Sequence, residues 1–320
     1  TIPDASASHV RIATAGTSGP IELAASTTRI ASLTQDTATD ATVNTAGKAF
    51  QTGGVVVPDG RASVTVGVAA NDGTLSSVQA NGEVVLNVSG GAVTVNAAVV
   101  NNGSATRLSK VGTGAATLTA DNAFSGNTGI GGGTLVLANS NALKNSTLTS
   151  GGAVFDQSVA SHAFNVGGLS GSHAQTLEDN AASPNPVALT VGTNNASTTF
   201  SGVLSGRGSL TKVGTGTLTL SGSSTYVGGT VLLKGTVTAS NAGSLGAGPV
   251  VNNGTLGLTA GAIEYTGLSV ALSGAGTNNV TLGAGTARTY LNGNYPGFTG
   301  VWNLGIGAAP EILRVCRQAE

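Results

Sequence analysis

Short stretches of alternating apolar and polar residues run through most of the chain. Two examples are Ala62–Val68 (ASVTVGV) and Glu83–Val88 (EVVLNV), in which every second residue is apolar. A period of two is typical of β-strands that bury one face. Gly, Asn and Asp gather between these stretches, as in Asn71-Asp72-Gly73, and favour turns. No segment keeps a helical period of 3.6 residues over several turns, so the pattern predicts an all-β fold with many short strands.

The candidate strands before residue 101 are short and rich in β-branched residues. We expect them at Ile21–Ala25, Arg29–Thr34, Ala41–Thr45, Gly54–Val57, Ala62–Val68, Thr74–Val78, Glu83–Val88 and Ala92–Val100. Residues 1–20 precede them and are expected to form an N-terminal strand or cap. Residues 310–320 (PEILRVCRQAE) are charged and lack Gly, so we expect a C-terminal cap or tail there.

One long stretch of the chain occurs twice. Residues 108–143 (LSKVGTGAATLTADNAFSGNTGIGGGTLVLANSNAL) return without a gap at residues 210–245 (LTKVGTGTLTLSGSSTYVGGTVLLKGTVTASNAGSL). Phe124 of the first copy is matched by Tyr226 of the second, and a degenerate third copy of this aromatic turn lies near residues 290–302. Self-similarity of this kind is typical of repeat folds and predicts the architecture of the whole chain.

The repeat favours a parallel β-solenoid, a single elongated domain with its body at residues 21–309. In such a fold each coil pairs with the coils above and below, apolar residues form inward ladders, and Gly lies at the corners. A coil of about 20 to 25 residues would give roughly 12 to 15 coils. The rival fold is an array of β-sandwiches, because the two copies are 102 residues apart (210 minus 108). The matching part is only the size of two coils and contains no tyrosine-corner pattern, so the solenoid is favoured.

Composition supports a fold with thin apolar layers. The chain has 320 residues, of which 50 are Gly, 40% are hydrophobic, 8% are charged and 3% are aromatic. An ordinary globular enzyme has about 25% charged residues, whereas a disordered chain has low hydrophobicity and high charge. The net charge of −1 gives no attraction to nucleic acid or to an anionic membrane, so we expect neither as a partner. No apolar run reaches about 18 residues, so we expect no membrane insertion of this chain.

The pattern of the second copy resembles that of a known family. Leu210–Gly222 (LTKVGTGTLTLSG) followed by Thr225–Thr230 (TYVGGT) resembles the autotransporter passenger-associated β-strand repeat, and residues 108–135 match nearly as well. The resemblance implies a right-handed parallel β-helix that is exported to the outer surface of a Gram-negative-like bacterium, or released from it. It also implies that the repeat supports folding of the passenger during export and is not a catalytic motif.

The Gly-rich turns and the shared lysine carry no predicted chemistry. The turns GTGAATL and GIGGGT lack the Lys-Ser/Thr pair of a phosphate-binding loop, and no helix follows them, so we interpret them as coil corners. Lys110 of the first copy is retained as Lys212 in the second. We expect both to be outward-facing turn charges and predict no catalytic residue and no cofactor.

A histidine pair near a polar stretch is the nearest approach to a metal site. His173 lies in residues 171–186 with Glu178 and Asp179, and His162 precedes them. A metal site needs about three converging ligands at defined distances. We therefore expect these residues to be solvated in a surface loop and predict no metal.

The candidates for assembly or surface contact are three aromatic residues and the single cysteine. They are Tyr226, Tyr295, Trp302 and Cys316; Tyr265 and Tyr290 are further aromatic candidates for a glycan. Cys316 has arginine neighbours, which favour the thiolate of an exposed cysteine. It is either a link between two subunits or a buried or tail residue with no chemical role.

The sequence thus predicts an extracellular, non-enzymatic structural solenoid. As a stalk, adhesin body or filament subunit, it would self-associate head to tail if its end coils are poorly capped. Two alternatives stay open. A polysaccharide-acting enzyme, suggested by fold analogy, needs two carboxylates within about 10 Å of each other along a groove. A carbohydrate-binding adhesin needs exposed aromatic side chains, with a glycan or a host surface as its partner.

Overall fold

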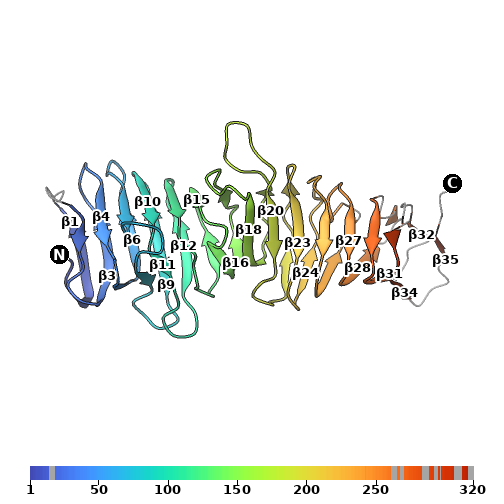
Figure 1. The fold of residues 1–320 in the computed structure, drawn as a ribbon, viewed down its shortest axis with the longest axis horizontal. Coiled ribbons are helices and arrows are strands. Elements are labelled where there is room, and N and C mark those ends of the chain that lie inside the picture. The colour runs from blue at the N-terminus through green and yellow to red at the C-terminus, as the bar shows by residue number, and fades with distance from the viewer. Residues whose placement is uncertain are drawn as a thin grey trace. The chain divides into compact units, whose positions relative to one another are not determined.

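The structure is a computed structural model that describes residues 1–13, 19–241, 243–260, 265–266, 270–282, 288–291, 295, 297–305 and 312–315. All regular elements in these residues are β-strands (Figure 1), and the strands pair in parallel. The all-β prediction is confirmed, because the strands of the described residues pair into parallel sheets that wind as a β-solenoid. The described residues include no helix long and apolar enough to cross a membrane.

The chain divides into two compact units. Unit 1 comprises Thr1–Gly167 with Asn180–Ala182, and unit 2 comprises Gly168–Asp179 with Ser183–Glu320. The boundary falls within β18 (Ala163–Leu169). Alternating strands and a copy of the repeat occur in each unit, so the hydrophobic pattern carries no sign of the division.

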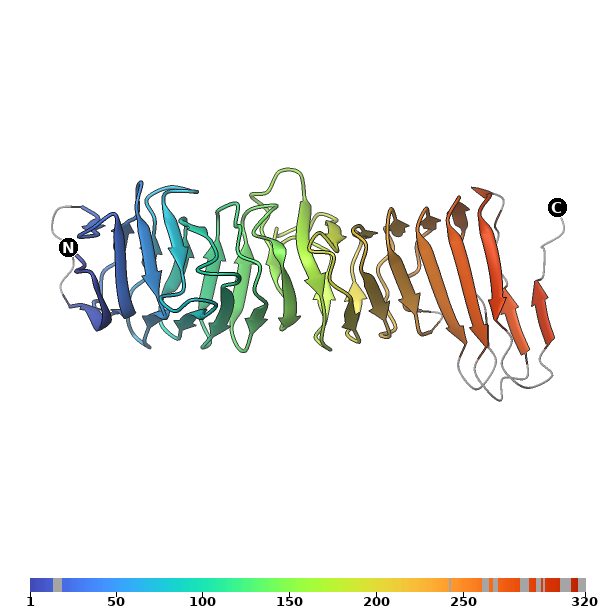
Figure 2. The same ribbon diagram turned by 90° about the horizontal axis from the view of Figure 1, so that it is seen from below.

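Unit 1 is built from two sets of parallel strands (Figure 2). The first set contains β1 (Ala5–Ile12), β3 (Thr27–Gln35), β5 (Ala49–Thr52), β6 (Gly54–Val57), β8 (Thr74–Ser76), β9 (Glu83–Val88), β11 (Ala98–Val99), β12 (Arg107–Val111), β14 (Thr128–Ile130) and β16 (Leu143–Ser150). The second set contains β2 (Ile21–Glu22), β4 (Ala41–Asn44), β7 (Val64–Val66), β10 (Ala92–Val95), β13 (Ala115–Leu118), β15 (Thr134–Leu137) and β17 (Val154–Phe155). Residues 1–20, the expected N-terminal strand or cap, contain β1.

Unit 2 repeats this plan. One set of strands contains β20 (Ala188–Val191), β23 (Ser209–Lys212), β25 (Thr230–Leu232), β27 (Val250–Asn252), β30 (Leu272–Gly274) and β33 (Gly297–Phe298). A second contains β21 (Thr198–Phe200), β24 (Thr217–Leu220), β26 (Thr236–Ala239), β28 (Thr255–Ala260), β31 (Thr277–Leu282) and β34 (Val301–Gly305). Two smaller sheets are β19 (Gln175–Thr176) with β22 (Leu204–Ser205), and β29 (Tyr265–Thr266) with β32 (Arg288–Leu291) and β35 (Ile312–Val315).

The core consists of inward ladders of aliphatic side chains. In unit 2, Leu218 pairs with Val237, and Val237 pairs with Leu256, which are steps of 19 residues (237 minus 218, 256 minus 237). All three are at most 1% exposed, while the threonines beside them are half-exposed. Each fully buried Leu or Val of this kind contributes about 1.5–3 kcal/mol through removal of apolar surface from water.

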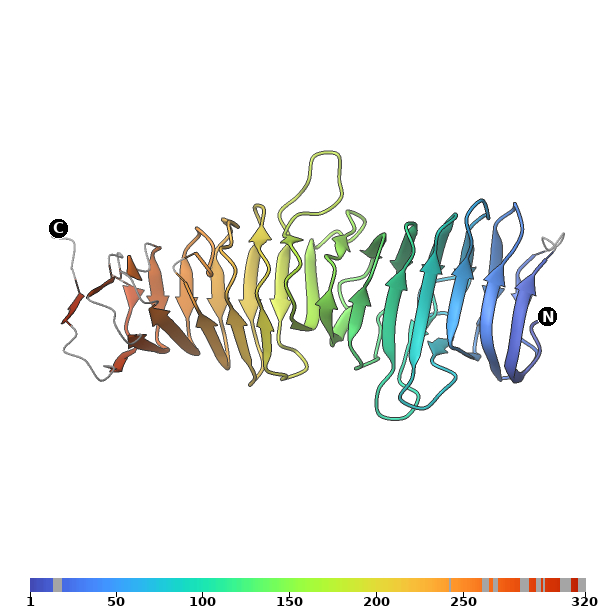
Figure 3. The same cartoon turned by 180° about the vertical axis from the view of Figure 1, so that it is seen from behind.

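Each copy of the repeat forms two consecutive coils. In the first copy β12 pairs with β14 and β13 pairs with β15; in the second, β23 pairs with β25 and β24 with β26. Figure 3 shows the ribbon from behind, with neighbouring loops projecting from unit 1 next to β11 and a second, long loop projecting from the stack of strands before β20. The second loop lies in the polar stretch that the sequence predicted as a surface loop.

Candidate functional site

The lysine that both repeat copies share points into the solenoid. Lys110 on β12 is 0% exposed and Lys212 on β23 is 1% exposed. The expectation of outward turn charges is therefore wrong. Leu108 and Leu210, two positions earlier, are buried as well, because alternate residues of a strand face the same side. This alternation, in LSK and LTK, was the signal that could have placed the lysines inside.

The Lys110 ammonium is held by backbone carbonyls. Its Nζ donates to the carbonyl oxygens of Val111 at 2.8 Å, Gly112 at 3.0 Å and Gly132 at 3.1 Å. Val111 is the last residue of β12, Gly112 lies in the corner that follows it, and Gly132 belongs to the corner of the next coil. The three donors of the ammonium are thereby matched by three acceptors.

The second copy repeats this arrangement. Lys212 Nζ donates to the carbonyl oxygens of Val213, of Gly214 at 3.2 Å and of Lys234 at 3.5 Å. None of the ion pairs among the described residues involves either buried lysine. Burial lowers the pKa of both Lys110 and Lys212, because the charged form loses its hydration.

Tyr226 lies in the core and does not reach the surface. The sequence placed it among the surface-contact candidates, but it is 0% exposed, as Phe124 is at 1% in the first copy. Its hydroxyl donates to Thr230 Oγ1, which in turn donates to the carbonyl oxygen of Leu245 at 3.0 Å. Burial raises the pKa of Tyr226. The expectation of an exposed ring is therefore wrong, because a large ring with a satisfied hydroxyl fits the interior of the coil.

Tyr295 and Trp302 lie together, as neighbours in an aromatic cluster. Their ring centroids are 5.6 Å apart, and Phe298 meets Trp302 edge-on at 5.5 Å. All three side chains are half-buried. Cys316 lies outside the described residues, as do the side chains of the further candidates Tyr265 and Tyr290.

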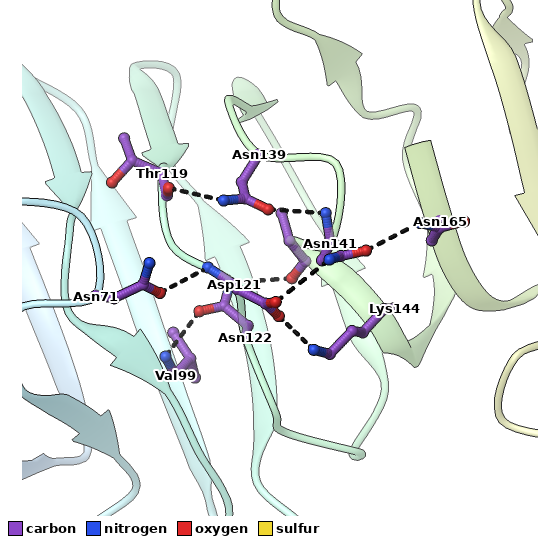
Figure 4. Close-up of polar contacts among 10 residues, drawn as sticks. Asn71, Val99, Thr119, Asp121, Asn122, Asn139, Asn141, Lys144 and Asn165 are labelled. Carbon is purple, nitrogen blue, oxygen red and sulfur yellow. Dashed lines mark hydrogen bonds and ion pairs between the residues drawn. The ribbon is translucent and has the colours of Figure 1, made fainter. Parts of the chain in front are cut away.

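A polar network links successive coils of unit 1 (Figure 4). The carboxylate of Asp121 pairs with Lys144 and accepts from Asn141 Nδ2 at 3.2 Å, while the Asp121 backbone N–H donates to Asn71 Oδ1 at 2.9 Å. Asn141 Oδ1 accepts from Asn165 Nδ2 at 2.9 Å. An ion pair this accessible to water contributes at most about 1 kcal/mol, so the network acts mainly by satisfying polar groups between coils.

The coils of the duplicated stretch match a known family of repeats. The sequence profile of the passenger-associated-transport-repeat matches residues 108–137 and 210–239. The chain carries this transport repeat twice. Both matches fall on the coil pairs described above, so the resemblance seen in the sequence is confirmed.

Similarity to one known protein extends well beyond the two transport repeats. The chain is 32% identical over 263 residues to a protein named "Adhesin BmaC autotransporter" from Brucella suis biovar 1 (strain 1330). The alignment covers 74% of this chain and 7% of that protein, so the chain spans a small part of the relative's length. No solved structure matches the chain.

Each copy of the longer duplicated stretch (residues 108–143 and 210–245) also contains an asparagine, just after the transport repeat, that hydrogen-bonds across two coils. Asn139 Nδ2 donates to the carbonyl oxygen of Thr119 at 3.2 Å, and Asn139 Oδ1 accepts from a backbone N–H at 2.8 Å. Asn241 makes the same pair of bonds, to the carbonyl oxygen of Ser221 at 2.7 Å and from a backbone N–H at 3.0 Å. The Asn at this place in both copies was visible in the sequence, but its partner one coil earlier was not.

The histidine and acids of the polar stretch have separate partners. His173 stands edge-on to Phe200 at 5.1 Å, and burial lowers its pKa. Glu178 accepts from Arg207 Nε at 2.7 Å, and Asp179 accepts from the backbone and side-chain nitrogens of Asn185 at 2.8 and 2.9 Å. Within the described ranges, no three His, Cys, Asp or Glu side chains are grouped so that they could hold a metal ion.

Carboxylates of the described residues neutralise basic side chains. The pairs are Asp4 with Arg29, Glu22 with Lys48, Asp36 with Arg11 and Arg61, Asp121 with Lys144, and Glu178 with Arg207. Each links residues at least 23 apart in sequence, as expected for contacts between coils. These ion pairs are a structural use of charge, because each one joins two coils.

Proposed function

We propose that this chain is a non-enzymatic, structural segment of an autotransporter passenger, displayed as a stalk or adhesin body outside a Gram-negative bacterium. The observation that carries the proposal is the coincidence of both transport repeats with paired coils of a β-solenoid. The adhesin autotransporter that matches most of this chain supports the same role. Because the chain spans a small part of that relative, the proposal concerns a segment of a passenger.

The physical basis is the pairing of backbone groups between coils. Strands of each unit are hydrogen-bonded to the coil before and after them, so few backbone groups are free for proteases or for partial unfolding. Ion pairs and asparagine clamps add side-chain links in the same direction. A segment of this kind suits the exposed outside of a cell, where no chaperone protects it.

Surface display is tested on intact cells of the bacterium that produces the protein. Antibodies against the purified chain should label these cells, and externally added protease should reduce the labelling several-fold. Antibodies against a periplasmic protein serve as the matched control and should label only permeabilised cells. Labelling of the chain that also requires permeabilisation would contradict the proposal.

A carbohydrate-binding adhesin is the second candidate, favoured by the adhesin name of the relative and by the half-buried pair of Tyr295 and Trp302. Aromatic rings with one accessible face suit the apolar faces of sugars. A glycan array probed with the wild-type chain and with Trp302→Ala tests this candidate, with Tyr226→Phe as a buried-site control. Binding should fall at least about tenfold only in Trp302→Ala (1.4 kcal/mol per tenfold); equal binding by all three proteins argues against this surface.

Head-to-tail self-association, with filaments as its product, is the assembly that we propose for the purified chain. Parallel strands extend by pairing with another parallel strand, so stacking of copies needs no new kind of contact. Light scattering and electron microscopy across a hundredfold range of concentration are the test. Growing mass and fibres are expected, and a monodisperse monomer at the highest concentration would rule the assembly out.

A further inference from the structure

We propose that the buried lysine of each transport repeat acts as a built-in cation. Its ammonium group is bound by a cage of backbone carbonyl oxygens and thereby fixes the register between two successive coils. The inference goes beyond the proposed function and does not depend on surface display. It rests on a site that occurs twice, once in each unit, with the same geometry.

The cage combines carbonyls from two coils. Lys110 Nζ donates to two carbonyl oxygens of its own coil and to the carbonyl oxygen of Gly132 in the next coil. Lys212 Nζ likewise donates to two carbonyl oxygens of its own coil and to that of Lys234 in the next. Backbone carbonyl oxygens can replace the hydration shell of a monovalent cation. Here the cation is covalently attached to the chain, so its position along the stack is set by the strand that carries it.

A glycine in the next coil leaves room for the cage. Gly133 and Gly235 have φ values of +62° and +74°, and each follows its lysine by 23 residues (133 minus 110, 235 minus 212). A Cβ at these positions would lie 2.8 Å from Lys110 Nζ and 2.9 Å from Lys212 Nζ. The lysine and this glycine therefore form a matched pair, one in each of the two coils that the ammonium joins.

The residues paired with the lysine in the coils before and after it are aliphatic and cannot fix the register between coils. Lys110 is aligned with Leu86 in the coil before and with Ile130 in the coil after, and Lys212 is aligned with Val191 and Leu232. Aliphatic side chains pack in any register that keeps them inside, so a slip of two residues preserves their burial. The ammonium discriminates, because only the native register brings it to the carbonyls, and buried polar groups are best attested in this register-setting role.

Replacement of both lysines by methionine separates register from stability. Met keeps the length and volume of the side chain, and an apolar residue in place of a buried charge is often neutral or stabilising. We therefore expect Lys110→Met/Lys212→Met to melt no lower than the wild type. After dilution from denaturant, however, the yield of molecules with the native hydrogen-exchange pattern should fall at least about threefold, because slipped registers trap part of the chain. A native yield equal to that of the wild type would overturn the proposal.

Chemical rescue tests the cage directly. Lys110→Ala leaves the carbonyls without their cation, so ammonium or methylammonium chloride should raise its native refolding yield about twofold or more, whereas tetramethylammonium chloride, which has no N–H donor, should not. Leu118→Ala, a buried apolar truncation in the same repeat, is the matched control for general salt effects. Equal responses of the two variants to ammonium would overturn the assignment. Should Lys110→Ala fail to refold in every salt, the missing rescue counts against the cage, and the methionine variant still decides the question of register.

Discussion

At the scale of single residues, the buried ammonium groups should make stability depend on pH. Burial lowers the pKa of Lys110 and Lys212 from the ordinary value of 10.5. Between the lowered pKa and 10.5 the unfolded chain binds more protons than the folded chain, so the free energy of unfolding rises with pH in this window. Below it both states are protonated and the slope vanishes. Urea unfolding measured from neutral pH to pH 10 should show the rise in the wild type but not in Lys110→Met/Lys212→Met. The same slope in both proteins would contradict this origin.

Burial of Tyr226 should lower the free energy of unfolding at higher pH, which is opposite to the effect of the buried lysines. Its hydroxyl is buried and its pKa is raised, whereas an unfolded tyrosine ionises near its ordinary value of 10. Above that value the folded chain holds a proton that the unfolded chain has lost, so stability falls as the pH rises further. Tyr226→Phe should remove part of this fall. It should also cost about 0.5–1.5 kcal/mol at neutral pH, because the hydrogen bond to Thr230 is lost. Unfolding curves of Tyr226→Phe, Thr230→Val and the double variant form the check, and additive costs would mean that the two side chains do not interact.

At the scale of elements, the corners of the coils should tolerate an added methyl group very unequally. Gly133 and Gly60 both have positive φ, +62° and +70°, but a Cβ on Gly133 would lie 2.2 Å from the carbonyl oxygen of Gly114, while nothing lies within 4 Å of one on Gly60. Gly60→Ala should therefore cost only the conformational penalty of about 1–2 kcal/mol. Gly133→Ala should cost clearly more, because backbone of the preceding coil must also move. Thermal and urea unfolding of the two variants compare them directly, and equal costs would show that the corner can relax.

Individual strands show which features of the fold could be predicted from the sequence. Local alternation predicted Glu83–Val88 with the bounds that β9 has, because the pattern of one strand is enough to set its faces. The inward direction of Lys110 was present in the same alternation, but the preference for placing charge outside overrode it. The carbonyl cage was not predictable, since it depends on which corner of the next coil arrives at the ammonium. That pairing is set by the number of residues in each coil, and the alternating pattern does not contain it.

The surface candidates failed or stayed open for a similar reason. Tyr226 lies in a turn, where no alternation tells inside from outside, and only the fitted coil shows that its ring is buried. Trp302 could be recognised as aromatic, but its partners Tyr295 and Phe298 come from a turn and a neighbouring strand. The network around Asp121 joins residues up to 50 apart, so sequence distance alone gave no signal for it.

At the scale of the whole molecule, each unit is a stack in which strands pair only with strands of neighbouring coils. We therefore expect the free energy of local unfolding to differ from coil to coil along the stack. In stacks of this kind stability is a sum of terms for each coil and each interface. A defect at Gly133 should therefore raise hydrogen exchange several-fold in β15, which follows that corner, and in β13, which pairs with β15 from the coil before, and leave β2 and β4 of the same unit close to wild type. Gly235→Ala should do the same to β24 and β26 in unit 2, and Gly60→Ala serves as the mild control. Hydrogen exchange followed by mass spectrometry resolves these strands. Uniform loss of protection through a unit would instead mean that its coils unfold as one cooperative body, because a defect in one coil would then lower the protection of every coil equally.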